Sequence, residues 1–201
     1  ITQMTIKHLI RRLARKAGLE INRFDPPQSP GARYAAQLAH HGIDTILDVG
    51  ANEGGYGTYL REIGYTGNIV SFEPSMVAHG ALSTRASVDP RWHVMPRMAL
   101  GSENGQVKLN VAGNSASSSI LTMGALHARA APQSRYVGSE TVQIRKLSDV
   151  EHDVIREARS IFLKIDTQGF ELPVLKGAGE FLARVRGVQV ELSLVELYSG
   201  Q

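Results

Sequence analysis

The sequence contains no cysteine, and no run of apolar residues approaches the roughly 18 that a membrane-spanning helix needs. The lack of cysteine excludes a disulfide scaffold, a zinc site with Cys ligands and a Cys nucleophile. No apolar core with a small-residue cleavage site follows the basic start, so we expect no secretory signal. These absences are typical of a cytoplasmic protein, and the length of 201 residues suits one α/β domain.

Acidic residues are scarce at the N-terminus. Residues 1–24 contain six Lys or Arg against Glu20 alone, which gives a net charge of +5, whereas the whole chain carries +3. The remainder is therefore close to neutral, unlike a uniformly basic nucleic-acid-binding protein. We expect no nucleic-acid partner.

A basic amphipathic helix is predicted over residues 5–17, where Ile6, Leu9, Ile10 and Leu13 recur at helical spacing opposite the cations. Packing of this apolar stripe on the domain is the favoured interpretation, because most amphipathic helices of soluble domains cover their own core. The alternative is peripheral contact with an anionic membrane, at the inner face.

Three prolines within residues 25–31 separate an N-terminal arm, 1–42, from a domain over 43–201. Short apolar segments alternate with helical ones in this domain, which predicts a Rossmann-like, mostly parallel α/β sheet with helices on both faces. The expected strands are 45–49, 68–72, 92–95, 106–111, 141–147, 160–165 and 188–194. The expected helices are 31–41, 55–63, 75–86, 148–157 and 170–183, and 115–119 is expected to be a loop.

The most informative segment is 45–57, in which an apolar strand runs into a Gly-rich turn and a helix follows. Glycines let the backbone turn sharply and approach a ligand closely, and free amides at the helix start can hold an anion. About 25 residues after Asp48, Glu73 ends the next strand, where its carboxylate can accept both hydroxyls of a ribose. Together these features predict a nucleotide-cofactor site; a tight turn without a ligand is the alternative.

Two residues favour S-adenosylmethionine over a nicotinamide cofactor. A nicotinamide fingerprint has Gly at its first two conserved positions, but the second is Asn52 here, which narrows the space for a pyrophosphate. The acid at Asp48 suits a cationic, amine-bearing ligand. A nicotinamide-dependent oxidoreductase and a non-catalytic interaction domain are the alternative functions.

Six blocks follow one another along the domain: 47–54 (LDVGANEG), 71–74 (SFEP), 99–101 (ALG), 117–119 (SSS), 163–171 (LKIDTQGFE) and 189–193 (QVELS). In this order they resemble the FkbM family of methyltransferases. The resemblance implies a class I methyltransferase fold and S-adenosylmethionine-dependent O-methylation of a hydroxyl, often on a sugar of a glycolipid or glycosylated secondary metabolite. The implied acceptor is a small molecule or a lipid-linked sugar, and the membrane alternative for the N-terminal helix would bring the protein to the latter. Family members usually continue past residue 201 with a helix and a hairpin, which implies that this chain lacks those last elements.

Nine residues are candidates for binding S-adenosylmethionine and its product, S-adenosylhomocysteine (SAH). They are Asp48, Gly50, Asn52, Gly54, Tyr56, Glu73, Pro74, Ala99 and Leu100. We expect Glu73 on the ribose and Ala99 and Leu100 near the adenine. For Tyr56, core packing is the equal alternative.

Asp166 and Glu191 are the candidate catalytic residues. Asp166 ends a predicted strand, where an open α/β sheet presents side chains to a ligand, so it can act as general base or orient the acceptor. Its alternative role is a cap for the following helix. Glu191 lies in an apolar run expected to form a central strand, where a carboxylate is costly to bury without a partner, and we therefore predict a role in the site.

Four further features leave alternatives open. Lys164 shares a strand face with Asp166 and either pairs with a carboxylate or is exposed. Glu171 is more consistent with stabilising the start of a helix than with function. Ser117–Ser119 either bind substrate or form a flexible loop. The seven histidines lack metal-ligand spacing, so no metal site is predicted.

Overall fold

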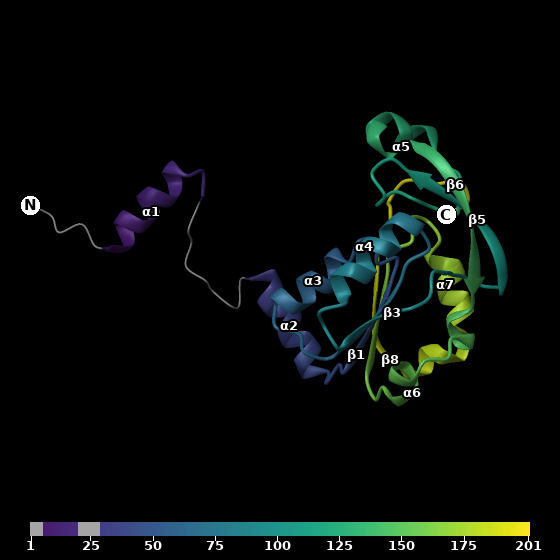
Figure 1. The fold of residues 1–201 in the computed structure, drawn as a ribbon, viewed down its shortest axis with the longest axis horizontal. Helices are drawn as coiled ribbons and strands as arrows, with labels where there is room; N and C mark the ends of the chain where they lie inside the picture. The colour runs from purple at the N-terminus through teal and green to yellow at the C-terminus, as the bar shows by residue number, and fades with distance from the viewer. Residues whose placement is uncertain (1–5, 20–28) are drawn as a thin grey trace, which may run out of the picture.

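The computed structural model describes residues 6–19 and 29–201 (Figure 1). Its helices are α1 (Ile6–Lys16), α2 (Pro30–His40), α3 (Gly55–Glu62), α4 (Met76–Ala86), α5 (Ala125–Ala130), α6 (Asp153–Glu157) and α7 (Glu171–Ala178), with the 3₁₀ helices η1 (Pro132–Ser134), η2 (Leu147–Asp149) and η3 (Gly179–Arg184). Its strands are β1 (Thr45–Val49), β2 (Asn68–Phe72), β3 (Trp92–Val94), β4 (Ala99–Leu100), β5 (Gly105–Ala112), β6 (Tyr136–Arg145), β7 (Ile161–Ile165) and β8 (Val185–Val190).

Five parallel strands in the order β3-β2-β1-β7-β8 form the central sheet. Side chains alternate between its two faces because a strand repeats every two residues. Ile46 and Ile69 pack with residues of α2, α3 and α4 on one face. Leu47 and Val70 pack with residues of α6 and α7 on the other. The predicted parallel sheet with helices on both faces is thus confirmed.

A second sheet, of order β4-β6-β5, lies beside the first (Figure 1). The strands expected over 106–111 and 141–147 belong to this sheet and pair antiparallel, so they do not join the parallel sheet. The physical reason is visible in β6, where buried Val142 and Ile144 alternate with exposed neighbours. Such alternation is typical of an antiparallel sheet with one solvated face.

Two of the expected helices are interrupted. The segment 148–157 is not one helix, because His152 has extended backbone angles (φ −155°, ψ 133°) and α6 begins only after it. The segment 170–183 changes from α7 to η3 at Gly179, whose φ of +48° ends the α-helix. Helix α5 was not predicted; it has no buried residue and so lacks the apolar periodicity that would reveal it.

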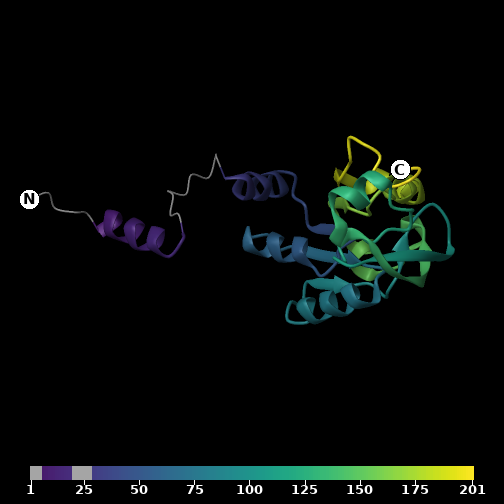
Figure 2. The ribbon, with the colours of Figure 1, turned by 90° about the horizontal axis from the view of Figure 1, so that it is seen from above.

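Helix α1 stands apart from the α/β domain in both views (Figures 1 and 2). Its four apolar side chains are exposed, so the favoured expectation that they pack on the domain is not met in the structure. Helix α2 does pack on the domain and buries Leu38. Most of the predicted proline linker lies outside the described residues. Among the described helices, none is long and apolar enough to cross a membrane.

Candidate cofactor and active site

The turn after β1 lies against the end of β7, its neighbour in the sheet. Gly50 has a φ of +76°, and a Cβ built on it would lie 1.8 Å from the backbone oxygen of Asp166. Only glycine therefore allows this approach. Asn52 also has a positive φ, of 47°, which is uncommon outside glycine and often marks a functional turn.

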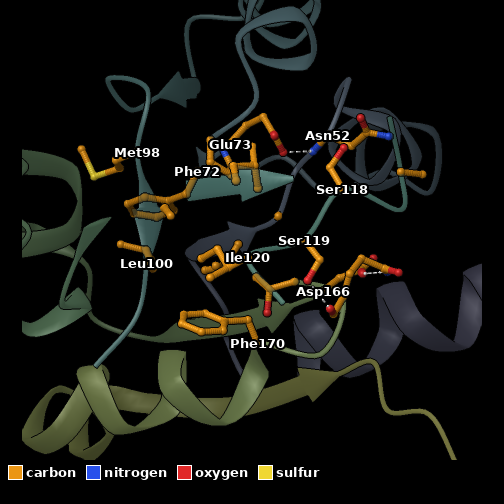
Figure 3. Close-up of a pocket in the computed structure, with 18 of the residues that line it drawn as sticks. Asn52, Phe72, Glu73, Met98, Leu100, Ser118, Ser119, Ile120, Asp166 and Phe170 are labelled. Carbon is orange, nitrogen blue, oxygen red and sulfur yellow. Dashed lines mark hydrogen bonds between the residues drawn. The ribbon is translucent and has the colours of Figure 1, made fainter. Parts of the chain in front are cut away.

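Glu73 follows β2 and is held by the same turn. Its Oε2 accepts a hydrogen bond from the Asn52 amide at 2.8 Å (Figure 3), and its Oε1 accepts one from the Ser75 amide at 2.8 Å. Burial raises the pKa of the Glu73 carboxyl to about 7, although the two amides oppose this shift. The carboxylate is thus fixed in place, and its remaining lone pairs can accept hydroxyl groups.

A cavity of about 110 Å³ lies between the end of the central sheet and the second sheet. One side is apolar and the other polar, as Figure 3 shows. The labelled apolar residues are Phe72, Met98, Leu100, Ile120 and Phe170, and the labelled polar ones are Asn52, Glu73, Ser118, Ser119 and Asp166. An aromatic base suits the first side and a polar tail the second.

Six of the nine predicted cofactor residues line this cavity: Gly50, Asn52, Glu73, Pro74, Ala99 and Leu100. Asp48, Gly54 and Tyr56 do not. Sequence reasoning missed Phe72, Met98 and Phe170. An apolar residue that lines a cavity produces the same hydrophobic pattern in the sequence as an apolar residue in the core, so the two cannot be told apart. It also missed Gln168, although this residue lies within the LKIDTQGFE block.

Lys164 connects three parts of the site. It is the register partner of Asp48, and its Nζ lies 3.1 Å from Asp48 Oδ1 and 3.5 Å from Asp166 Oδ2. The same Nζ donates to the Gly50 carbonyl at 3.2 Å. Burial lowers the pKa of Lys164, but the two carboxylates outweigh it and raise the pKa overall, so the ammonium stays charged. Of the two alternatives for Lys164, the pairing with carboxylates is confirmed.

Tyr56 packs beside this cluster. The Lys164 ammonium lies 5.4 Å from the centre of the Tyr56 ring, within the range of a cation–π contact. The hydroxyl of Tyr56 is hydrogen-bonded to that of Tyr34 from α2, which also donates to Gln189 at 3.2 Å. Tyr56 is therefore packed against the domain, and its contact with the cofactor stays a prediction.

Asp166 comes directly after β7 and lines the cavity. Its Oδ1 accepts a hydrogen bond from the side-chain amide (Nε2) of Gln168 at 2.8 Å. Gln168 has a φ of 57° and is held by hydrogen bonds from Ser119, at 2.7 Å, and from Tyr198, at 2.9 Å. The cap residue of α7 is Phe170, so Asp166 is not the helix cap that was its alternative role.

Glu191 requires a correction. It lies beyond β8, which ends at Val190 because its partner β7 ends at Ile165, and its side chain is exposed. Within the described part of the chain, β8 is the edge of the sheet. The premise of a buried carboxylate in a central strand was therefore wrong. Glu191 nevertheless neighbours Asp166, whose hydrogen bond and charge raise the pKa of Glu191 to about 7.

Two other predictions concern the loops around the cavity. Glu171 accepts hydrogen bonds from the amides of Thr167 and Gly169, which confirms its structural role. The loop that contains Ser117–Ser119 is fixed to β5, because the Ser118 hydroxyl accepts a hydrogen bond from the Ala112 amide at 3.0 Å. Both Ser118 and Ser119 line the cavity. In the described ranges, no three His, Cys, Asp or Glu side chains are grouped so that they could hold a metal ion.

The groups that line the cavity suit the chemistry of the cofactor that the sequence predicts. Asn52 Oδ1 is buried and has no hydrogen-bond partner among the described residues, so it can accept from an amine or hydroxyl of a ligand. Gly50 keeps the turn free of a side chain, and Glu73 offers a carboxylate for a ribose. Each of these groups matches a part of S-adenosylmethionine.

The sheet order corresponds to 3-2-1-4-5, with the Gly-rich turn after the first strand and an acid after the second. This arrangement defines a doubly wound α/β domain of the nucleotide-cofactor-binding class. Residues 48–201 match the sequence model of the Methyltransferase FkbM domain. The chain belongs to this family of methyltransferases, whose cofactor is S-adenosylmethionine.

Comparison of structures gives more distant similarities. An O-methyltransferase from Bacillus cereus in complex with SAH is 15% identical, with a TM-score of 0.36, over 88% of this chain and 62% of that one. An SAH-bound Podospora anserina methyltransferase, PaMTH1, is 13% identical, with a TM-score of 0.37, over 89% of this chain and 65% of that one. The chain thus spans less than two thirds of either protein. No curated protein matches the sequence significantly.

Proposed function

We propose that this chain is an S-adenosylmethionine-dependent O-methyltransferase that acts on a hydroxyl group, of the kind carried by the sugar of a glycolipid or glycosylated secondary metabolite. The observation that carries the proposal is the position of Asp166 and Glu191. These two neighbouring carboxylates follow the carboxyl ends of β7 and β8, and Asp166 lines the cofactor cavity, where a proton acceptor for a hydroxyl is required.

Glu73 would hold the ribose hydroxyls, Asn52 Oδ1 the amine of the methionyl group, and the apolar side of the cavity the adenine. Bound S-adenosylmethionine would supply an electrophilic methyl group, whose bond to sulfur breaks as its bond to the acceptor oxygen forms. The protein's main contribution is to hold the acceptor in line and away from water.

The acceptor hydroxyl must lose its proton, and the two carboxylates divide this task. Asp166 contacts the Lys164 ammonium through Oδ2 and the side-chain amide of Gln168 through Oδ1. Asp166 in turn raises the pKa of Glu191, which makes Glu191 a stronger base than an ordinary glutamate. The Asp166–Glu191 pair therefore takes up the proton, with Asp166 nearer the cofactor cavity and Glu191 nearer solvent.

Calorimetric titration of one sample with SAH and with NAD tests the cofactor. SAH should bind and NAD should not; the reverse would support the oxidoreductase, and binding of neither would support a non-catalytic domain. Transfer of labelled methyl from S-adenosylmethionine to simple glycosides then tests the reaction. The product should resist alkali, since a methyl ether does and a methyl ester does not.

A further inference from the structure

Helix α1 presents an unpartnered apolar face. The exposed fractions are 74% for Ile6, 44% for Leu9, 49% for Ile10 and 58% for Leu13. At 100° per residue these four side chains fall within about 100° of the helix circumference, which makes a continuous stripe. Exposed contiguous apolar surface of this kind marks a site of interaction.

Charge identifies the partner of this face. Positions 6–16 read IKHLIRRLARK and contain no Asp or Glu. At the same 100° per residue, the exposed Arg15 lies opposite the apolar stripe, and the exposed Arg12 and Lys16 flank the stripe on its Leu9 side. A protein groove that binds an apolar stripe does not need such a uniform positive charge, and a nucleic acid does not need the stripe. An anionic lipid surface uses both, because acyl chains take the apolar face while headgroups meet the cations.

We infer that α1 is a docking surface for an anionic membrane. The helix lies in the plane of the interface, with Ile6, Leu9, Ile10 and Leu13 toward the acyl chains. The cations are then at headgroup level, where their attraction is screened over about 8–10 Å at physiological salt. This docking is independent of the methyltransferase activity proposed above, because no residue of the cofactor cavity takes part in it.

Sedimentation of the full chain with vesicles tests the inference. Vesicles of phosphatidylcholine with added phosphatidylglycerol should bind the chain, and high salt should release it; vesicles of phosphatidylcholine alone should not bind it. Leu13→Glu should weaken binding by about tenfold or more, because it places a charge in the buried stripe. Arg12→Gln should weaken it by about fivefold, the usual effect of one cation near such a surface.

Val88→Glu is the matched control, since Val88 is 88% exposed in the loop after α4 and receives the same change of charge. It should bind vesicles like the unchanged chain. All variants should keep the same Tm, because the altered side chains are exposed. The inference is overturned if anionic vesicles do not bind, if Leu13→Glu and Val88→Glu behave alike, or if the chain binds duplex DNA or self-associates through α1 instead.

Discussion

Lys164 is the residue on which the charges of the site depend. The residue is 7% exposed, and its ammonium compensates the fully buried carboxylate of Asp48 and also contacts Asp166 and the Gly50 carbonyl. A buried ion pair adds little stability compared with an apolar pair, but loss of one partner leaves a charge without compensation. Lys164 is therefore required by the fold as well as by the site.

Lys164→Met keeps most of the length of the side chain and removes its charge. The free energy of unfolding should fall by about 3–5 kcal/mol, because the Asp48 carboxylate remains buried without a cation. Urea unfolding measures this. Lys108→Met is the control, since Lys108 is exposed, and the double variant Asp48→Asn/Lys164→Met should recover part of the loss. An unchanged free energy of unfolding in Lys164→Met would show that the Asp48–Lys164 ion pair is not required for stability.

Glu73 should make SAH affinity depend on pH. Ribose hydroxyls donate to the ionised carboxylate, but burial raises the pKa of Glu73 to about 7, so below this pH a proton must leave before the ligand binds. The Kd should therefore rise as the pH falls through about 7, by up to about tenfold per pH unit. Calorimetry over this range measures it.

Glu73→Ala should weaken SAH binding by about 1–3 kcal/mol and remove this pH dependence. Glu53→Ala is the matched control, because Glu53 lies in the same turn but is exposed, and its Kd should follow that of the unchanged protein. If Glu73→Ala binds SAH normally, Glu73 is not a ribose ligand.

The carboxylate pair should control the rate. Asp166→Asn should lower kcat by about 10²–10⁴-fold and leave the Kd of SAH within roughly tenfold. In the unchanged enzyme kcat should fall on the acid side with a midpoint near pH 7, because protonated Glu191 cannot accept a proton. Asp166→Asn removes the neighbouring charge, so the pH at which the remaining kcat falls by half on the acid side should be lower than in the unchanged enzyme. A flat pH profile at saturating substrate would contradict proton uptake by this pair.

At the scale of elements, the position of the β1–α3 turn depends on how closely β1 and β7 approach each other. Gly50→Ala forces a left-handed backbone on a residue with a Cβ and places that Cβ against the Asp166 carbonyl. Stability should fall by at least about 1–3 kcal/mol and SAH binding should be lost. Gly55→Ala is the control, because nothing lies within 4 Å of its Cβ. Equal thermal unfolding and equal SAH titration of the two variants would refute this requirement.

At the scale of the whole molecule, the cofactor cavity lies between two sheets whose strands do not pair with one another. SAH should stabilise both together, by about 2.7 kcal/mol at a concentration of 100 times its Kd. For a chain of this size, Tm should rise by roughly 5–11 °C. Differential scanning calorimetry measures this, and NAD is the control. A Tm that does not respond to SAH would mean that this cavity does not bind it.

The sequence by itself determined the elements that consist of neighbouring residues. Strand β1, its Gly-rich turn and α3 lie within 18 consecutive residues, so apolar periodicity and turn chemistry were enough to predict them. The position of Glu73 followed from its place after the next strand. The LKIDTQGFE block was sufficient to identify Asp166 as a candidate site residue, but not to show which side chains bind its carboxylate.

Only the tertiary structure decided which distant residues meet. The contact of Lys164 with Asp48 depends on the strand order that places β7 beside β1, and no local pattern encodes that order. The place of Glu191 next to Asp166 depends on where β8 ends, which its partner strand sets. The apolar wall of the cavity includes residues from the second sheet, and burial in a core and burial against a ligand leave the same signal in a sequence. Pairing between strands far apart in the chain is the physical reason for the first two, and the position of the second sheet against the first is the reason for the third.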